Sequence, residues 1–414
     1  MSNDARLMPV IGIQRNEPDI PNDEFETLLG DEGLPFGTWS ATLEIDHCEN
    51  PATCLSYQRF FLRGLNAETA GKARLAGHSV RLLGKLTQIG VPGSVSALRA
   101  LGARRGPDAS RAGNHVGRYT LSLGPDRRNV RVAIDAEDSG CTLDPDSLMW
   151  SDLYFKTNKW SHIVYDPKVR PCVNGNSRLD DKGFATLRAL RNTPKKNDLV
   201  YWAKLWAPVN RASPVVNAAI IEHQLRVFEA LARVPAKTSL LAILPKRLPF
   251  VDLDECRHRL EQAGVAWQVG WGDIDTQAFW RGLAEAEIAF LRPGNHHCVS
   301  WRMTDLLCMG ACVMYEGAPF PQWYAPLICN RHFVHAGCRL GPDFSLPEQR
   351  RYDDIPHKIM SLLEKPEMMC RLRESAQDYF ERYVHPSAVA RYVMAQVRAF
   401  ADARRQPSVL GRTA

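Results

Sequence analysis

The stretch from Ser300 to Gly317 reads SWRMTDLLCMGACVMYEG. Its first half is a short amphipathic segment that stops at Gly310, and residues 311–315 are almost wholly apolar. Directly upstream, FLRPGNHHCV is a second apolar run that breaks into Pro, Gly, Asn and two histidines. The pattern predicts two buried strands that are joined by a polar loop and a short helix.

The same alternation extends over the chain from residue 215 onward. Strand patterns alternate with helical patterns at 217–234 (helix), 238–244 (strand), 252–264 (helix), 265–271 (strand), 275–286 (helix) and 287–293 (strand). Such alternation predicts parallel βαβ units with helices on both faces of the sheet. Because the carboxyl ends of the strands meet at one edge, a ligand is expected in the crevice beyond that edge.

The preceding part of the chain predicts a second domain. Strand patterns occur at 118–123, 129–136, 152–158 and 198–208, with helical patterns at 70–90 and 182–192. Two prolines in WAPVNRASPVV predict a domain boundary near 208–214. We therefore expect an N-terminal domain over 1–212, a Rossmann-like domain over 213–350 and three helices over 351–414.

Length and composition are those of an ordinary two-domain globular chain. The 414 residues are 45% hydrophobic and 24% charged, and no run of about 18 apolar residues predicts a membrane span. The first residues, MSNDARLMPV, lack a signal-peptide pattern, so we expect a cytoplasmic protein. The 11 cysteines contain no CxxC pair and are expected to be reduced thiols.

Charge is unevenly distributed in the N-terminal part. Residues 1–50 contain 11 acidic and 2 basic residues, whereas residues 63–131 contain 13 basic and 3 acidic residues. This basic insert is either a solvated surface or a contact for an anionic partner, for which we expect peripheral binding to an anionic membrane. No nucleic-acid-binding module accompanies it, so no nucleic acid is expected.

The polar residues around Ser300 predict an anion site. Ser300 is a good N-cap, and the first turn of a helix leaves N–H groups that attract anions. Arg302 adds a charge that fits phosphate, and Asp305 can accept hydrogen bonds from a ribose diol. The alternatives are that Ser300 only caps the helix, that Arg302 pairs with Asp305, and that the histidines His296 and His297 are satisfied loop residues.

A resemblance to a known family rests on these residues. The segment AEIAFLRPGNHHCVSWRMTDLLCMGACVMYE resembles the nucleotide-sugar motif of GT-B glycosyltransferases, in which an acidic residue precedes a glycine by five positions, as Asp305 precedes Gly310. The resemblance covers about 215–403. It implies an α/β protein with two Rossmann-like domains that face each other across a cleft, and with C-terminal helices that pack back on the N-terminal domain.

The resemblance also implies functional residues. It implies that Asp305 binds the nucleotide ribose and that Ser300 and Arg302 contact the diphosphate. Retaining members of the family carry a glutamate where this chain has His297, which departs from their pattern. The donor-binding residues expected from the motif and from the neighbouring strand ends are Lys246, Arg247, Asn295, His296, Ser300, Arg302 and Asp305.

Two polar strand ends in the N-terminal domain are candidates for the acceptor side. In IDAEDSG, Asp138 is the first candidate for a catalytic base and Asp135 the second, whereas a turn or cap is the alternative role for both. In YFKTNKW, Lys156 and Lys159 either meet an acidic acceptor or are solvated. His297 is a second candidate for a catalytic role, because histidine can transfer protons near neutral pH.

Other classes of site fit less well. The spacing of His296, His297, Cys298, Cys308 and Cys312 differs from that of zinc sites, and neither GxGxxG after a strand nor GxSxG is present. We therefore expect a hexosyltransferase-type glycosyltransferase, acting in cell-surface polysaccharide or glycolipid synthesis, with a nucleotide diphosphate-sugar as co-substrate, a hydroxyl acceptor and neither metal nor cofactor. The alternative is a non-catalytic nucleotide-sugar-binding or scaffold protein.

Overall fold

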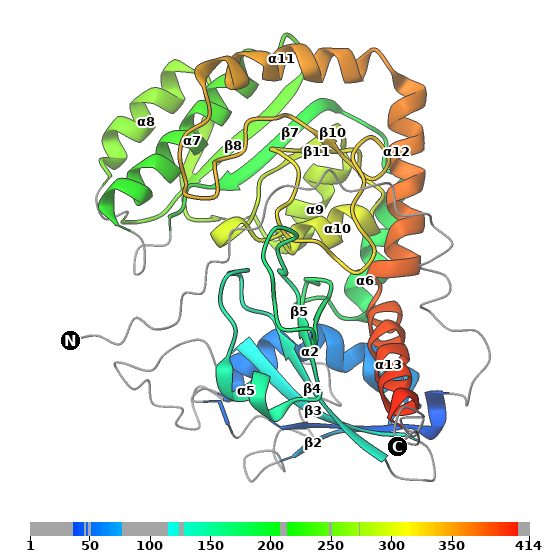
Figure 1. Cartoon of the computed structure of the whole chain (residues 1–414). Coiled ribbons are helices and arrows are strands. Elements are labelled where there is room, and N and C mark those ends of the chain that lie inside the picture. Colours follow the sequence, from blue (N-terminus) through cyan, green and yellow to red (C-terminus); the bar gives the residue numbers. More distant parts are fainter. Residues whose placement is uncertain are drawn as a thin grey trace, which may run out of the picture. The chain divides into compact units, whose positions relative to one another are not determined.

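The chain folds into two α/β units, which confirms the fold class expected from the sequence. The computed structural model describes residues 36–44, 47–48, 51–76, 115–123, 128–207, 213–247, 251–272 and 274–404. Most of the basic insert lies outside them, so its predicted membrane contact does too. Figure 1 shows the two units, which consist of Met1–Asp180, Phe320–Pro326 and Glu381–Ala414 (unit 1) and of Asp181–Pro319 and Leu327–Phe380 (unit 2).

Unit 1 contains a six-stranded mixed sheet in the order β2-β1-β3-β4-β5-β6. Strands β1 and β2 are parallel, β3 is antiparallel to both β1 and β4, and β4, β5 and β6 are parallel. The described elements are η1 (Phe36–Thr38), β1 (Ser40–Glu44), α2 (Pro51–Glu68), β2 (Ala73–Ala76), β3 (Val116–Leu123), β4 (Arg128–Asp135), α5 (Pro145–Trp150), β5 (Leu153–Lys156), β6 (Val169–Pro171) and α13 (Pro386–Ala403).

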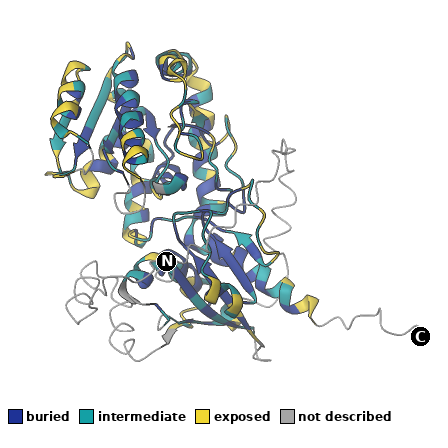
Figure 2. Cartoon of the chain, turned by 60° about the vertical axis from the view of Figure 1, so that its left-hand side comes forward, coloured by how far each residue is buried: buried dark blue, intermediate teal, exposed yellow. Residues whose placement is uncertain are grey.

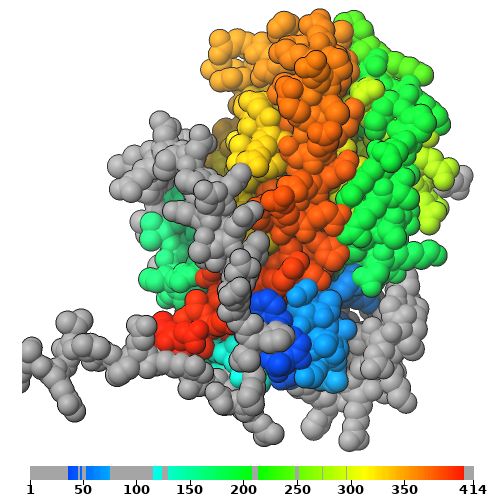
Figure 3. Space-filling view, turned by 90° about the vertical axis from the view of Figure 1, so that its right-hand side faces the viewer, coloured from blue at the N-terminus to red at the C-terminus, as the bar shows by residue number. Residues whose placement is uncertain are grey.

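The helix predicted over 70–90 is wrong in its described part. Residues Ala73–Ala76 form β2, which pairs with β1, and the helix of this region is α2. The C-terminal helix α13 packs against α2, and Figure 3 shows the two side by side in red and blue. A carbon added at Gly64 of α2 would lie 1.9 Å from the carbonyl oxygen of Pro386, so only glycine permits this close approach. The expected return of the C-terminus to the N-terminal domain is thus confirmed for α13.

Unit 2 contains a six-stranded parallel sheet in the order β12-β11-β10-β7-β8-β9. Counted along the chain from β7, this is the 3-2-1-4-5-6 order of the Rossmann fold. Its elements are α6 (Asp181–Ala189), η3 (Leu190–Asn192), β7 (Asn197–Lys204), α7 (Pro214–Ala232), β8 (Thr238–Leu244), α8 (Leu253–Gln262), β9 (Ala266–Val269), α9 (Thr276–Ala284), β10 (Ala286–Leu291), η4 (Asn295–His297), α10 (Arg302–Cys308), β11 (Val313–Tyr315), β12 (Val334–His335), α11 (Gln349–Leu363) and α12 (Pro366–Tyr379). A π-helical turn, η5 (Phe380–Val384), follows α12 and leads back into unit 1.

Helices cover both faces of this sheet because successive side chains of its strands point to opposite faces. Tyr201 of β7 contacts Phe228 of α7, with ring centroids 4.7 Å apart. The next residue, Trp202, lies 6.2 Å from Phe279 of α9 on the other face. Figure 2 shows the strands of both units as mainly buried, with exposed residues on the outer faces of the helices.

The division of the chain differs from the predicted boundary. The strand β7 was expected in the N-terminal domain, but it pairs with β8 and β10 in the middle of the second sheet. Unit 2 therefore begins at Asp181, and not at 213. Helices α11 and α12, which were expected to form a separate segment with α13, belong to unit 2.

Candidate functional site

The strand order of unit 2 creates one place where a ligand is expected. The chain runs outward from β7 in one direction and from β10 in the other, so the connections that leave these neighbouring strands diverge. Ligands of doubly wound sheets bind in this crevice, beyond the carboxyl ends of the strands. The crevice follows Lys204, the last residue of β7, and Leu291, the last residue of β10.

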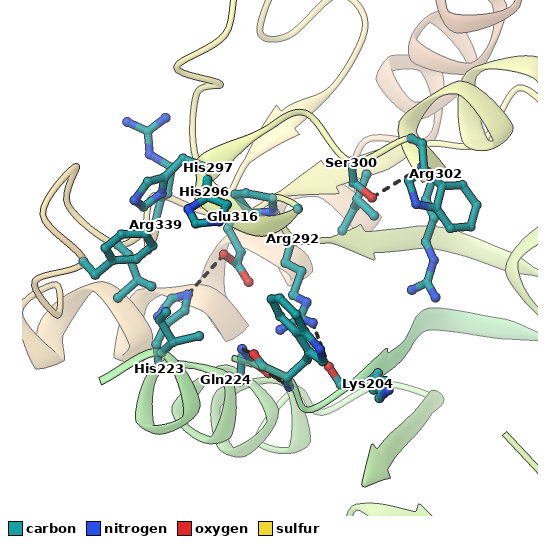
Figure 4. Close-up of a pocket in the computed structure, with 18 residues that line it drawn as sticks. Lys204, His223, Gln224, Arg292, His296, His297, Ser300, Arg302, Glu316 and Arg339 are labelled. Carbon is teal, nitrogen blue, oxygen red and sulfur yellow. Dashed lines mark hydrogen bonds and ion pairs between the residues drawn. The ribbon is translucent and has the colours of Figure 1, made fainter. Parts of the chain in front are cut away.

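A cavity of about 330 Å³ lies at this place, and we call it the switch-point cavity (Figure 4). It is formed by the ends of β7 and β10, the middle of α7, the loop before α10, the residue after β11 and the loop before α11. The lining residues are Lys204, Trp206, Ile220, His223, Gln224, Leu291, Arg292, Pro293, Gly294, His296, His297, Ser300, Trp301, Arg302, Glu316, Arg339, Leu340 and Phe344.

Cationic side chains dominate the lining, which contains Lys204, Arg292, Arg302 and Arg339 against a single carboxylate, Glu316. Arg292 Nη2 donates a hydrogen bond of 2.7 Å to the carbonyl oxygen of Lys204, which ties the two strand ends together. Burial lowers the pKa of Arg339 to about 10, so this guanidinium remains protonated at neutral pH. The cavity therefore attracts an anionic ligand.

Arg302 is held by aromatic rings. Its guanidinium carbon lies 4.7 Å from the ring centroid of Phe279 and 5.3 Å from that of Trp271, within the range of a cation–π interaction. In Figure 4, Arg302 and Lys204 lie on one side of the close-up and Arg339 and His297 on the other. The cations thus surround the cavity from two sides.

The loop between β10 and α10 has a strained backbone. His296 and His297 have φ angles of 53° and 59°, in the left-handed region that residues other than glycine rarely adopt. Each such residue costs about 1–3 kcal/mol, and strain of this kind clusters at functional sites. The loop is closed by a hydrogen bond of 2.9 Å from the Gly294 amide to the Cys298 carbonyl.

His297 is neutral at physiological pH. Its side chain is buried and stacks on Phe344 with ring centroids 4.4 Å apart. Burial, followed by the charge of Arg339, lowers the pKa of His297 to about 4. The imidazole can therefore exchange hydrogen bonds at neutral pH, but it contributes no positive charge for a phosphate. Its catalytic role stays a prediction.

The start of α10 differs from the prediction, because Trp301 and not Ser300 is the N-cap residue, and the amides of the first turn are less open than the sequence suggests. α10 has only 7 residues. The amide of Arg302 donates to Ser300 Oγ at 3.3 Å, the amide of Met303 to the Ser300 carbonyl at 2.8 Å, and the amide of Thr304 to the Trp301 carbonyl at 3.1 Å. These three amides are thus used within the chain, while the side chains of Ser300 and Arg302 still line the cavity.

The structure does not bring every predicted donor-binding residue to the cavity. Asp305 is buried, accepts a hydrogen bond from Trp280 and lies outside the lining, so we leave it out of the proposed site. Lys246 and Arg247 are exposed after β8 and are not lining residues either. The side chain of Asn295 lies outside the described part of the chain. His296, His297, Ser300 and Arg302 do come together at the cavity.

In unit 1, Asp135 is part of a buried ion pair. Lys156 Nζ lies 3.0 Å from Asp135 Oδ2, the side chains are 0% and 1% exposed, and Tyr154 donates its hydroxyl to the same oxygen at 2.6 Å. Burial raises the pKa of Asp135, although Lys156 and Tyr154 oppose the shift. This geometry leaves Asp135 unsuited to act as a base on a substrate. Asp138 is partly exposed after β4.

Sequence reasoning missed six polar lining residues: Lys204, His223, Gln224, Arg292, Glu316 and Arg339. Arg292 and Glu316 carried a usable signal, because each lies at the carboxyl end of a predicted strand. Lys204 ends β7 in the structure but lies in the middle of the predicted strand. His223 and Gln224 lie within the long helix α7, where no pattern distinguishes a cavity residue from an ordinary helical one.

No family model matches the chain, and no curated protein matches its sequence. Its fold resembles HepE from Anabaena in complex with UDP and glucose, with 11% identity, 86% of this chain and 99% of HepE covered, and a TM-score of 0.43. A glycosyltransferase from Rickettsia africae ESF-5 has 8% identity, coverages of 62% and 64% and a TM-score of 0.37. The lipopolysaccharide outer core galactosyltransferase WaaB has 12% identity, coverages of 61% and 64% and a TM-score of 0.38. The chain thus spans less than two thirds of the length of the last two proteins.

Two structural features are absent from the described residues. Within them, no helix has both the length and the apolar character that crossing a membrane requires. No group of three or more His, Cys, Asp or Glu side chains in the described ranges is arranged to hold a metal ion.

Proposed function

We propose that the switch-point cavity binds the nucleotide diphosphate part of an activated sugar, and that the protein is a glycosyltransferase that moves this sugar to a hydroxyl acceptor. The observation that carries the proposal is the position of four cations, Lys204, Arg292, Arg302 and Arg339, around a cavity at the switch point of a 3-2-1-4-5-6 sheet. Apolar and aromatic lining from Trp206, Leu291 and other residues would accommodate the rings of a nucleotide.

The chemistry follows from this charge distribution. When the bond between the sugar and the diphosphate breaks, negative charge builds up on the leaving phosphate oxygen. Preorganised cations stabilise that charge more strongly in the transition state than in the ground state, which accelerates the reaction. In this proposal Arg292 and Arg302 stabilise the leaving diphosphate, and Lys204 adds charge from the end of β7.

The acceptor hydroxyl must lose a proton to a base. Asp138 stays our proposal for this base, because it follows β4 and is partly exposed, whereas Asp135 is buried beside Lys156. In the variant Asp138→Asn, we expect normal donor binding and strongly reduced transfer. Undiminished transfer by this variant would remove Asp138 from the mechanism.

Binding of donors to the full chain tests the proposal directly. Saturation-transfer NMR with UDP- and GDP-sugars would identify a donor, and release of free nucleotide over hours would report turnover. We expect Arg292→Gln to weaken donor binding by a factor of about 10 or more, because a charged hydrogen bond contributes about 1.5–3 kcal/mol. The control Arg371→Gln changes charge equally on α12, where the side chain is 69% exposed.

The outcomes separate the two classes of function. The proposed site would be contradicted if Arg292→Gln and Arg371→Gln bound the donor with equal affinity. It would also be contradicted if the protein bound none of these donors. Binding without nucleotide release, in the presence of a broad set of acceptors, would favour the non-catalytic binder. A hexosyl donor, a role in surface polysaccharide synthesis and contact with an anionic membrane are finer proposals that depend on which donor and acceptor are found.

A further inference from the structure

Glu316 is an unusual residue in the cavity wall. It follows β11 directly, its side chain is 3% exposed, and it is the only carboxylate among the lining residues. Its Oε2 lies 3.0 Å from His223 Nε2, whereas its Oε1 has no hydrogen-bond partner among the described residues. A buried oxygen without a partner is energetically costly, especially on a charged group, so this atom indicates a ligand that donates a hydrogen bond to it.

The neighbours of Glu316 fix its orientation. His223 of α7 contacts Glu316 through Nε2, and its Nδ1 lies 2.8 Å from the hydroxyl of Tyr352 on α11. Both ring nitrogens are thus engaged, so the imidazole cannot turn without losing two hydrogen bonds. Figure 4 shows one oxygen of Glu316 facing His223 and the other pointing away from it. The chain Tyr352–His223–Glu316 therefore presents a single carboxylate oxygen in a fixed position.

The chemistry of this oxygen limits what it can bind. A carboxylate accepts hydrogen bonds and donates none, so the ligand must supply a hydroxyl or an N–H group. A phosphate cannot do so, and its charge would be repelled by Glu316. The cations Lys204, Arg292, Arg302 and Arg339 already account for an anionic part of the ligand. The cavity thus fits a molecule with an anionic part and a neutral, hydrogen-donating part.

We infer that Glu316, held by His223 and Tyr352, accepts a hydrogen bond from a sugar hydroxyl of the donor and so contributes to the choice of donor. This inference rests on the proposed function. The hydroxyl belongs either to the transferred sugar or to the ribose, since both present the same group. Sugar hydroxyls that are matched by a buried acceptor are discriminated strongly, because an analogue that lacks the hydroxyl leaves the acceptor without a partner.

A coupling experiment on the full chain tests the inference. Calorimetric titration first determines which of UDP-glucose and GDP-mannose binds more tightly. The titration is then repeated with the matching nucleoside diphosphate, its 2′-deoxyribose and 3′-deoxyribose forms, and analogues that lack single hydroxyls of the transferred sugar. We expect the wild-type protein to bind one analogue about tenfold or more weakly than the ligand that has all its hydroxyls. In Glu316→Gln, most of this difference in affinity should disappear.

The pattern of losses identifies the hydroxyl. If the transferred sugar supplies it, Glu316→Gln binds the sugar nucleotide less tightly but binds the nucleoside diphosphate as the wild type does. If the ribose supplies it, both affinities fall, and either the 2′-deoxyribose or the 3′-deoxyribose form shows the coupling. Tyr352→Phe is a second variant that keeps the carboxylate and releases His223, for which we expect a smaller loss of discrimination. Glu255→Gln on α8 removes an exposed carboxylate elsewhere and serves as the control.

The results distinguish a failure of this inference from a failure of the proposed function. If the wild type binds the sugar nucleotide and Glu316→Gln discriminates between all the analogues as the wild type does, the inference is overturned while the proposed function stands. If the wild type binds none of the nucleotides, the proposed function fails, and the inference fails with it. A thermal unfolding scan of each variant checks folding, and Tyr352→Phe still tests the inference if Glu316→Gln does not fold.

Discussion

The indole N–H of Trp280 donates a hydrogen bond of 3.1 Å to Oδ2 of Asp305. Trp280 is 7% exposed and Asp305 is 1% exposed, so this bond lies inside unit 2 between α9 and α10. The acid that the sequence motif would assign to a nucleotide ribose therefore holds two helices together in this structure. Its carboxylate faces the protein interior and not the switch-point cavity.

The hydrogen bond between Trp280 and Asp305 should make a measurable contribution to the free energy of unfolding. Trp280→Phe keeps most of the packing and removes the donor, so we expect the free energy of unfolding to fall by about 1–3 kcal/mol from the lost bond to a buried carboxylate. Asp305→Asn keeps an acceptor and should cost less than Asp305→Ala. Urea unfolding measured through tryptophan fluorescence tests the order, and equal stability of Trp280→Phe and the wild type would contradict it.

Breaking the buried ion pair in unit 1 should destabilise the protein more than losing the Trp280–Asp305 hydrogen bond. Lys156→Met leaves the carboxylate of Asp135 buried without its cation, and breaking such a pair costs about 3–5 kcal/mol. We expect faster hydrogen exchange of the amides of β4 and β5. The control Lys196→Met removes a lysine that is 63% exposed and also paired, for which we expect almost no change. Similar exchange in the two variants would show that the buried pair contributes little.

Two glycines with positive φ angles provide a matched comparison. Gly310 ends α10 with φ 64°, and a carbon added there would lie 2.2 Å from Gln377 Nε2. Gly264 ends α8 with φ 70° and has nothing within 4 Å. In both alanine variants the free energy of unfolding should fall by about 1 kcal/mol, because alanine is strained in the left-handed conformation. The fall should be larger for Gly310→Ala, because Gln377 must also move. Addition of Gln377→Ala should recover the difference, and an equal loss in the two single variants would contradict the steric part.

His332 predicts a pH dependence of stability. Burial lowers its pKa from 6.5 to about 4, and its Nδ1 accepts a hydrogen bond of 3.0 Å from the Ile328 amide, which requires the unprotonated ring. The unfolded chain therefore binds more protons below pH 6.5, so this stability is complete above that pH and is lost as the pH falls toward 4. The stability lost by the acid end of this range is about 3 kcal/mol.

The variant His332→Asn separates this contribution from the others. Asparagine can keep an acceptor near the Ile328 amide but does not titrate. We expect its melting temperature to fall less than that of the wild type between pH 7 and pH 4.5, while His297 still contributes a dependence of the same sign. Parallel curves for the variant and the wild type would show that His332 is not responsible.

The second half of the fold could be predicted because its sequence pattern is local. Strands β8, β10 and β11 are short apolar runs, and the helix predicted over 275–286 is capped at its start by Asp275, whose side chain accepts a hydrogen bond of 2.7 Å from the Ala278 amide. The position of β7 could not be predicted, because a strand pattern does not reveal which sheet the strand joins. Its partners β8 and β10 are 34 or more residues away along the chain.

The candidate site was predictable only where it depends on one loop. Residues 296–302 are at the expected place because a strand end and a helix start determine it. The direction of Asp305 was not predictable, since one turn of a helix can face either the cavity or the interior. Glu316 and His223 come together from β11 and α7, 93 residues apart, and no spacing in the sequence indicates such a pair.

The most direct measurement is a crystal structure of the full chain with the nucleoside diphosphate that binds most tightly. The account predicts the two phosphates within hydrogen-bond distance of Arg292 and of at least one of Lys204, Arg302 and Arg339, with the ligand inside the switch-point cavity. A nucleotide bound elsewhere, or a cavity that remains empty at saturating nucleotide, would contradict it.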